Sequence, residues 1–349
     1  MIPVADKVTM QRIATQLKIS KVTVSKALNG RPGVSEATRG RIEGMARELG
    51  YQLPNKPEAS VKRRFGFLVP SRFFLETDKF YTKIFYHLTR HCEADGHTLS
   101  LRIVDGHEEL VGSHPFADRG TLDGIFVGGE FHEAYLAHVI GGPPLVCLDF
   151  SKPRIVADAV VIDNFYASYV ATEYLIQKGH RAIGFVGDPA YSENVADRYY
   201  GFLKALLEAH LSVPPEWRLD VNDAEGIYFP DVQLPADPPT AWVCHCDLAA
   251  YQMLRVLQQR GWSVPGDVSL IGFDNTELSR KMEPPLTSVD INTKAIADEA
   301  YRRMVWRMVH RTEPAQRLVL STRLAERASV RSVSLAEPPT ATGVLTSMS

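Results

Sequence analysis

Two lysines near the N-terminus lie where one short helix can present both of them outward. Helical spacing of apolar residues predicts this helix over residues 21–28, with Val24, Ala27 and Leu28 on its inner face. The outward residues are then Lys21, Val22, Ser25 and Lys26. An outward lysine can donate hydrogen bonds to guanine O6 and N7, whereas a valine senses only groove shape or a thymine methyl group. This face has the chemistry to read base edges in the major groove.

Two further helices must hold this helix in place. Apolar residues at helical spacing predict one helix before it and one over residues 36–49: Ile13, Ala14 and Leu17, then Ile42, Met45, Ala46 and Leu49. Thr9, Ser20 and Ser35 each precede a helix, where a hydroxyl can accept from first-turn amides. Gly50 then ends the third helix. The pattern is that of a helix-turn-helix, which disfavours the alternative of a three-helix cap with no nucleic-acid role.

The residues from Val8 to Tyr51 resemble the DNA-binding headpiece of the lactose-repressor (LacI/GalR) family. The family pattern is present as VTMQRIA, SKVTVSKALNG, VSEATR and LGY. The resemblance implies that Lys21, Val22 and Lys26 select the operator sequence, while other residues position the headpiece on phosphates. The phosphate contacts would be Thr9, Ser25, Asn29 and Thr38, and we expect Ser20, Thr23 and Ser35 at the DNA as well.

Charge is distributed unevenly along the chain. Residues 1–64 contain 13 Lys or Arg and 5 Asp or Glu, a balance of +8, which leaves −10 for the remainder of a chain whose net charge is −2. The basic end favours a polyanion through phosphate contacts and counterion release. The charge pattern therefore agrees with a headpiece over residues 1–52.

Residues 53–64 are polar and contain two prolines, so they read as a linker in which a short helix can form. In the resembled family this segment is a hinge helix that wedges a leucine into the minor groove. Here Leu53 is an additional residue, and the wedge position falls on Val61. We include Val61 among the expected DNA contacts.

From Phe65 onward, apolar strands alternate with helical stretches, as a doubly wound parallel α/β sheet requires. The alternation of strands and helices begins a second time near residue 159, which predicts a two-lobed, periplasmic-binding-protein-like domain over residues 65–332. We assign residues 65–155 and 292–323 to the first lobe, and 159–288 and 324–332 to the second. The family resemblance extends to about residue 330 through DRYYGFLKAL and SVPGDVSLIGFDNTELSRKMEPPLTSV. Residues 333–349, rich in Ser, Thr and Pro, should form a disordered tail.

Open parallel sheets bind ligands beyond the carboxyl ends of their strands, so polar residues that follow strands are candidate ligand contacts. Arg198, Asp149 and Asp274 hold such positions, with a salt bridge or a capped turn as the alternative for each. Cys246 stands where the family has a ligand-binding asparagine. The predicted effector site is Phe74, Asp149, Arg198, Cys246 and Asp274.

Aromatic and histidine residues near these positions have alternative interpretations. Phe73, Phe74, Phe80 and Tyr81 follow the first strand and could stack on a ligand, or instead pack in the core or a dimer interface. Tyr228 and Phe229 are similar candidates in the second lobe. His180 matches a Gly-His turn of the family, so we expect a structural role.

The sequence excludes several classes of protein. It contains no signal peptide and no long apolar run, so we expect a cytoplasmic, nucleoid-associated protein with no membrane partner. The four cysteines lack disulfide or zinc-ribbon spacing. Cys244, His245 and Cys246 are adjacent and are candidate metal ligands by residue type, but no metal or cofactor is predicted.

The predicted function is that of a transcriptional regulator, most simply a repressor in carbohydrate metabolism. A homodimer would bind a pseudo-palindromic DNA operator, and a small-molecule effector, a sugar or sugar derivative, would bind between the lobes. The alternative is an enzyme acting on a small polar metabolite in the cleft. The G-x-G-x-x-G, G-x-x-x-x-G-K-[ST], G-x-S-x-G and H-E-x-x-H motifs are all missing, so no catalytic residue is assigned.

Overall fold

The chain divides into two compact units, residues 1–62 and residues 63–349, in the computed structural model. The structure describes residues 9–28, 33–49, 51, 62–74, 79–112, 116, 121–139, 142–223 and 232–334. Asn29, Val61, Tyr228, Phe229 and the predicted tail from residue 335 onward lie outside these ranges.

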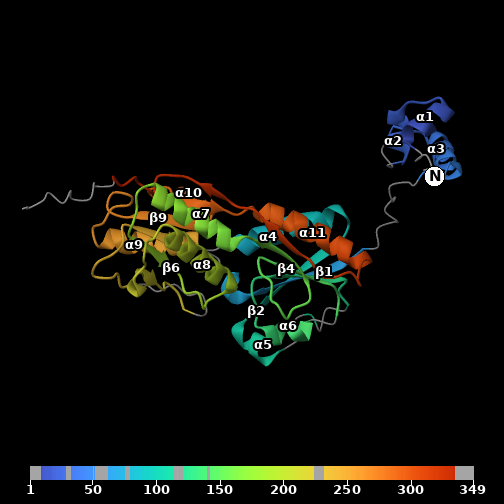
Figure 1. Cartoon of the computed structure of the whole chain (residues 1–349). Helices are drawn as coiled ribbons and strands as arrows, with labels where there is room; N and C mark the ends of the chain where they lie inside the picture. The colour runs from blue at the N-terminus through green and yellow to red at the C-terminus, as the bar shows by residue number, and fades with distance from the viewer. Residues whose placement is uncertain are drawn as a thin grey trace, which may run out of the picture. The chain divides into compact units, whose positions relative to one another are not determined.

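The first unit is a three-helix domain, as predicted (Figure 1). Its helices are α1 (Met10–Leu17), α2 (Lys21–Leu28) and α3 (Glu36–Glu48). They bury one small core, made of Ile13, Ala14, Val24, Ala27, Leu28, Ile42 and Ala46. Lys18, with φ of 53°, adopts the left-handed conformation that ends α1 and lets the chain turn into α2.

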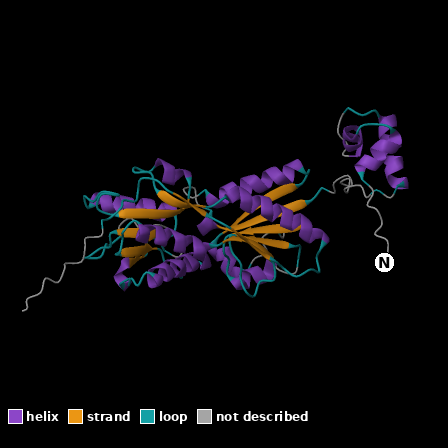
Figure 2. Ribbon diagram, turned by 45° about the horizontal axis from the view of Figure 1, so that its top comes forward, coloured by secondary structure: helices purple, strands orange, loops and turns teal. Residues whose placement is uncertain are grey.

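The second unit contains two six-stranded sheets with helices packed against them (Figure 2). The first sheet contains β1 (Arg64–Pro70), β2 (Thr98–Val104), β3 (Gly124–Gly128), β4 (Leu145–Leu148), β5 (Asp158–Ile162) and β11 (Arg317–Leu320), in the order β11-β5-β4-β3-β1-β2. The second contains β6 (Ile183–Val186), β7 (Arg218–Leu219), β8 (Ala241–Cys244), β9 (Ser269–Asp274), β10 (Thr287–Asp290) and β12 (Arg323–Ala325), in the order β12-β10-β9-β8-β6-β7. Only β12 pairs antiparallel among these described strands. Central strands such as β3 and β4 are buried along their whole length, because helices cover both faces of a parallel sheet.

Helices complete two lobes, which we call lobe 1 and lobe 2 after the first and second sheets. Lobe 1 carries α4 (Phe80–Ala94), α5 (Gly106–Val111), α6 (Glu133–Val139) and α11 (Thr293–Val309). Lobe 2 carries α7 (Asn164–Gln177), α8 (Glu193–Glu208), α9 (Asp247–Gln259) and α10 (Glu277–Lys281). Helices α7 and α8 pack closely because residue 201 is glycine: a Cβ there would collide with the carbonyl oxygen of Phe165. None of the helices in the described ranges is long and apolar enough to cross a membrane.

The chain passes between the lobes three times, after β5, after β10 and after β11. This arrangement corrects one expectation, since the strand at residues 159–163 was assigned to lobe 2. The observed strand, β5, pairs with β4 and β11 in lobe 1. An apolar strand of this length fits either sheet, and only its tertiary partners decide between them. Arg323 was likewise assigned to lobe 1 but lies in β12 of lobe 2.

Side-chain caps set two element boundaries near the predicted site. Helix α8 begins at Glu193, because the Ser192 hydroxyl accepts from the amide of Val195. Strand β8 ends at Cys244, and Cys246 is the N-cap of α9.

A buried ion pair fastens the last long helix to the first sheet. Asp158 at the start of β5 is 1% exposed and accepts from Arg307 of α11 at 2.6 and 2.9 Å. Arg307 also donates to the carbonyl oxygens of His310 and Pro314, at 3.0 and 2.9 Å. The amide of Gln316 donates to Asp158 at 2.8 Å, which fixes the start of β11 beside β5.

Substitution Asp158→Ala should lower the free energy of unfolding of the larger unit by about 3–5 kcal/mol, because it leaves a buried guanidinium without its carboxylate. Urea denaturation of the full chain measures this change. Glu299→Ala is the matched control, because it breaks the Arg302–Glu299 pair of the same helix, whose arginine is 70% exposed, and should cost less than about 1 kcal/mol. Equal losses in the two variants would contradict a structural role for the buried pair.

Candidate functional site

The outward face of α2 is a candidate nucleic-acid interface. Lys21 and Lys26 are exposed and Val22 is 64% exposed, whereas Val24, Ala27 and Leu28 are buried against α1 and α3. Arg39 of α3 donates to the carbonyl oxygen of Ala27 at 2.6 Å and so ties the end of α2 to the headpiece core. The position of α2 in the headpiece is therefore fixed, and its polar face is exposed.

Hydroxyl groups cap the three helices of the headpiece. The amide of Arg12 donates to Thr9 at 3.4 Å, which begins α1. Ser20 accepts from the amide of Thr23 at 3.0 Å, and the hydroxyls of the two residues are 2.8 Å apart. Ser35 and Thr38 repeat this arrangement at the start of α3, at 3.3 and 2.8 Å. These residues stabilise the helix N-termini. The backbone amides at a helix N-terminus that have no partner within the helix can bind phosphate oxygens of DNA.

The second candidate site lies between the two lobes, at the carboxyl ends of their strands. An inner chamber of about 90 Å³ is lined by Phe73, Phe80, Tyr81, Glu130, Asp149, Tyr191, Ser192, Asn194, Val195, Arg198, His245, Cys246, Leu248 and Asp274. Four of the five predicted effector residues are among them: Asp149, Arg198, Cys246 and Asp274. Phe74 is not; it is half-buried and packs against the hydrophobic core, while its neighbour Phe73 lines the chamber. The short 3₁₀ helix Ser71–Phe73 sets which of the two rings faces inward.

Arg198 is the central cation of the inner chamber and is 6% exposed. It donates through Nε to Asn164 Oδ1 at 2.7 Å and through Nη1 to the carbonyl oxygen of His245 at 2.5 Å. Its guanidinium lies 4.0 Å from the centre of the Phe273 ring, and Nη2 is 3.8 Å from Asp274 Oδ1. The planar guanidinium is therefore held by groups from α7, from β9 and from the segment between β8 and α9.

The two aspartates of the chamber have left-handed backbone conformations at the ends of strands: Asp149 directly follows β4, and Asp274 is the last residue of β9. Asp149 has φ of 66° and Asp274 has φ of 94°. Asp149 is 4% exposed; its Oδ2 accepts from Tyr81 at 3.2 Å and from Asn194 of lobe 2 at 2.7 Å. Aspartate tolerates this backbone region better than most residues, and the turn aims the carboxylate into the space between the lobes.

His245 and Cys246 lie between β8 and α9. Burial, helped by the charge of Arg198, lowers the pKa of His245 to about 4, so the ring is neutral at physiological pH. Its Nδ1–H donates to the carbonyl oxygen of Val186 at 3.1 Å, which leaves Nε2 facing Cys246 Sγ at 3.5 Å. The Cys246 sulfur accepts from the amide of Ala249 at 3.4 Å as the N-cap of α9. Within the described ranges, no three His, Cys, Asp or Glu side chains are arranged to hold a metal ion.

Two buried residues, Asp247 and His180, support the site rather than line it. Asp247 is 1% exposed and accepts from Thr276 at 2.6 and 2.8 Å and from Ser288 at 2.6 Å, which holds the turn after β9. Burial raises the pKa of Asp247 to about 6 against the effect of these hydrogen bonds. His180 is fully buried and its Nδ1 lies 2.8 Å from the Thr240 hydroxyl, a structural contact, as expected.

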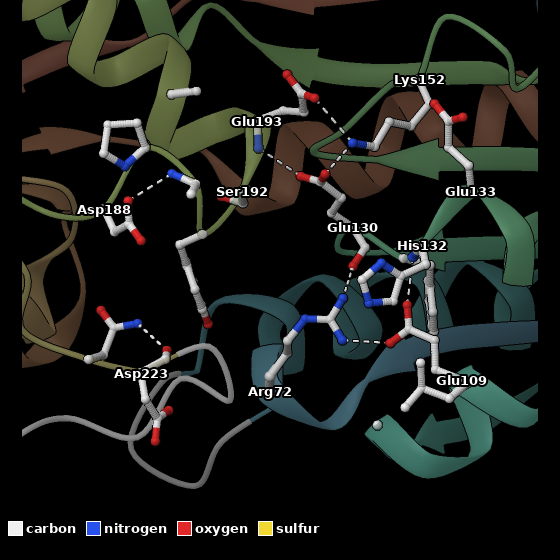
Figure 3. Close-up of a pocket in the computed structure, with 18 of the residues that line it drawn as sticks. Arg72, Glu109, Glu130, His132, Glu133, Lys152, Asp188, Ser192, Glu193 and Asp223 are labelled. Atoms are coloured by element: carbon white, nitrogen blue, oxygen red, sulfur yellow. Dashed lines mark hydrogen bonds and ion pairs between the residues drawn. The ribbon is translucent and has the colours of Figure 1, made fainter.

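An outer chamber of about 1210 Å³ adjoins the inner one and shares Glu130, Tyr191 and Ser192 with it (Figure 3). Lys152 of lobe 1 forms ion pairs with Glu130 and, at 3.2 Å, with Glu193 of lobe 2. Glu130 also accepts from the amide of Glu193 at 2.8 Å, and Arg72 pairs with Glu109 at 2.6 Å. Sequence analysis missed these residues, although Glu130 and Lys152 follow β3 and β4 and thus carried the same signal as Asp149.

Comparison with known proteins identifies the family. Residues 9–55 match the description "Bacterial regulatory proteins, lacI family", and residues 172–330 match "Periplasmic binding protein-like domain". The chain is 30% identical over 338 residues to the HTH-type transcriptional repressor PurR of Escherichia coli O139:H28, covering 92% of this chain and 96% of that protein.

Solved structures show the same architecture. A complex of the transcriptional regulator CelR with cellobiose is 27% identical, covers 92% of this chain and 99% of its own, and superposes with a TM-score of 0.65. The Lac repressor dimer bound to operator and the anti-inducer ONPF is 21% identical, covers 93% of this chain and 100% of its own, with a TM-score of 0.64. The helix-turn-helix headpiece, the two lobes and these relatives together establish that the chain belongs to the lacI family of bacterial regulatory proteins and is a DNA-binding transcriptional regulator, not an enzyme.

Proposed function

We propose that this regulator is a homodimeric repressor whose affinity for a pseudo-palindromic operator is set by a sugar or sugar derivative bound between its lobes. The observation that carries the proposal is the inner chamber, where a buried arginine and two aspartates converge from both lobes of a chain that also has a headpiece. Hydroxyl-rich ligands suit this set, because Arg198 donates and Asp149 and Asp274 accept hydrogen bonds.

The relatives support the ligand class and the assembly. The CelR structure contains cellobiose, a similar Enterococcus faecium regulator contains ribose, and the Lac repressor is described as a dimer on its operator. A dimer places two headpieces on two half-sites, which is why we expect an operator with two-fold symmetry. We place the protein in the cytoplasm at the nucleoid, with residues 1–52 as headpiece, 53–64 as hinge and 333–349 as tail.

Two sets of headpiece residues are proposed to act differently on DNA. Lys21, Val22 and Lys26 would face base edges. Thr9, Ser20, Thr23, Ser25, Asn29, Ser35, Thr38 and Val61 would contact the backbone or the minor groove. This division follows from the exposure of the lysines and Val22 on α2 and from the caps at the helix N-termini.

The substitution Lys26→Ala should cost roughly 1–3 kcal/mol on the preferred half-site and relax preference at one base pair, because a base contact is lost. Ser25→Ala should weaken binding to all sequences about equally, because a phosphate contact carries no sequence information. Site selection from random DNA at one fixed salt concentration distinguishes the two outcomes. An unchanged selected motif for Lys26→Ala would remove this lysine from the base-reading set.

Arg198→Lys should weaken effector binding at least about tenfold, because lysine keeps the charge but loses the planar fork. Calorimetry with the sugar that a thermal-shift screen identifies measures the change, and operator binding without effector should stay as in the unmodified chain. Arg255→Ala, on the exposed face of α9, is the control and should alter neither affinity. Unchanged effector affinity in Arg198→Lys would show that the effector binds elsewhere.

A further inference from the structure

The cleft between the lobes is strongly acidic. Among the described residues, its two chambers are lined by ten carboxylates, three of them at the inner chamber, and by the three cations Arg72, Lys152 and Arg198. Two cations outside the lining pair with some of these carboxylates: Arg218 with Asp188 and Asp220, and Arg154 with Glu133. The whole chain has a net charge of only −2. The cavity itself marks the ligand site, and the surrounding charge determines which ligands it admits, because a cleft lined by one sign of charge concentrates ions of the opposite sign.

Each of the three cations is already compensated by the protein. Arg72 pairs with Glu109 at 2.6 Å and donates to the carbonyl oxygen of Glu130. Lys152 lies between two glutamates, and its side chain is 13% exposed (Figure 3).

Arg198, the inner cation, is 3.8 Å from Asp274 and uses two further donors on Asn164 and His245. His245 adds no charge, because burial lowers its pKa to about 4. A ligand carboxylate or phosphate would therefore lose its hydration shell without gaining a new ion pair, because each of these three cations is already paired with a carboxylate of the protein.

Aromatic rings complete the inner chamber. Phe73 packs edge to face on Tyr191 at 5.6 Å, and Phe80 packs edge to face on Tyr81 at 5.0 Å between ring centres. All four rings line the chamber beside Asp149. Ring faces attract cations, and they also stack on the apolar faces of sugar rings. Carboxylates together with aromatic faces form the environment that a protonated amine requires.

We propose that the effector of this regulator is a protonated amine that also carries hydroxyl groups, an amino sugar being the simplest example, and that the cleft rejects sugar acids and sugar phosphates. The inference rests on the proposed function, since it concerns the ligand of the same cleft. Asp149 provides the counter-charge at the inner chamber, while the outer carboxylates raise the local concentration of cations.

The test uses hexose derivatives that share one pyranose ring and differ chiefly in charge, with the full chain in the absence of DNA. Glucose, glucosamine, glucuronate and glucose 6-phosphate form one series, and galactosamine, mannosamine and the β-1,4 dimer of glucosamine extend the amines. Calorimetry should show one amine binding at least about tenfold tighter than its neutral parent, with glucuronate and glucose 6-phosphate not bound at about 10 mM. Added salt should reduce this preference.

Asp149→Asn separates charge from shape, because asparagine tolerates the φ of 66° and keeps an acceptor for Tyr81. This variant should lose the preference for the amine, so that the amine and its neutral parent bind with affinities within about twofold of each other. Glu216→Gln, an exposed carboxylate outside both chambers, is the matched control and should keep the preference.

Three outcomes would overturn the inference: an anion that binds as tightly as the neutral sugar, a neutral sugar that binds as tightly as its amine, or no amine bound at about 10 mM. A neutral or anionic sugar that binds would still leave the proposed function standing. Failure of the proposed function is seen separately, because the same preparation would then select no operator from random DNA.

Discussion

The cleft between the lobes depends on the polar partners of the buried Arg198 guanidinium. Moving a charge out of water costs several kcal/mol even after relaxation, so the burial of Arg198 requires partners in fixed positions. They come from the start of α7, the end of β8 and the end of β9: Asn164, His245 and Asp274. One side chain thereby sets the relative positions of a crossover and two strand ends, and Phe273 beneath it fixes the plane of the fork.

The same helix that carries Arg198 also makes the contacts between the lobes. Glu130 of lobe 1 accepts from the first amide of α8, where a carboxylate is favoured by the helix dipole, and Asp149 accepts from Asn194 one residue later. A ligand that competes for Asp149 acts on these contacts directly. Such a ligand would bind with different affinity to states that keep or lose them, which is the physical requirement for allosteric control.

Local patterns in the sequence correctly predict those parts of the structure that depend on residues close together in the chain. The three headpiece helices and their hydroxyl caps follow from spacing alone, as does the placement of Asp149, Arg198 and Asp274 near the carboxyl ends of strands. What failed depended on contacts distant in sequence. The strand at 158–162 fits either sheet by composition, and the choice between Phe73 and Phe74 depends on one turn of 3₁₀ helix.

The central claim is that one chain couples ligand binding in its cleft to operator binding at its headpiece. The most direct test of this coupling is calorimetry, in which the sugar or amino sugar that binds the protein is titrated into the free protein and into the operator-bound protein. Linkage predicts dissociation constants that differ by about 5- to 150-fold, with operator affinity changed by the same factor in the presence of ligand. Equal constants in the two titrations would contradict the account.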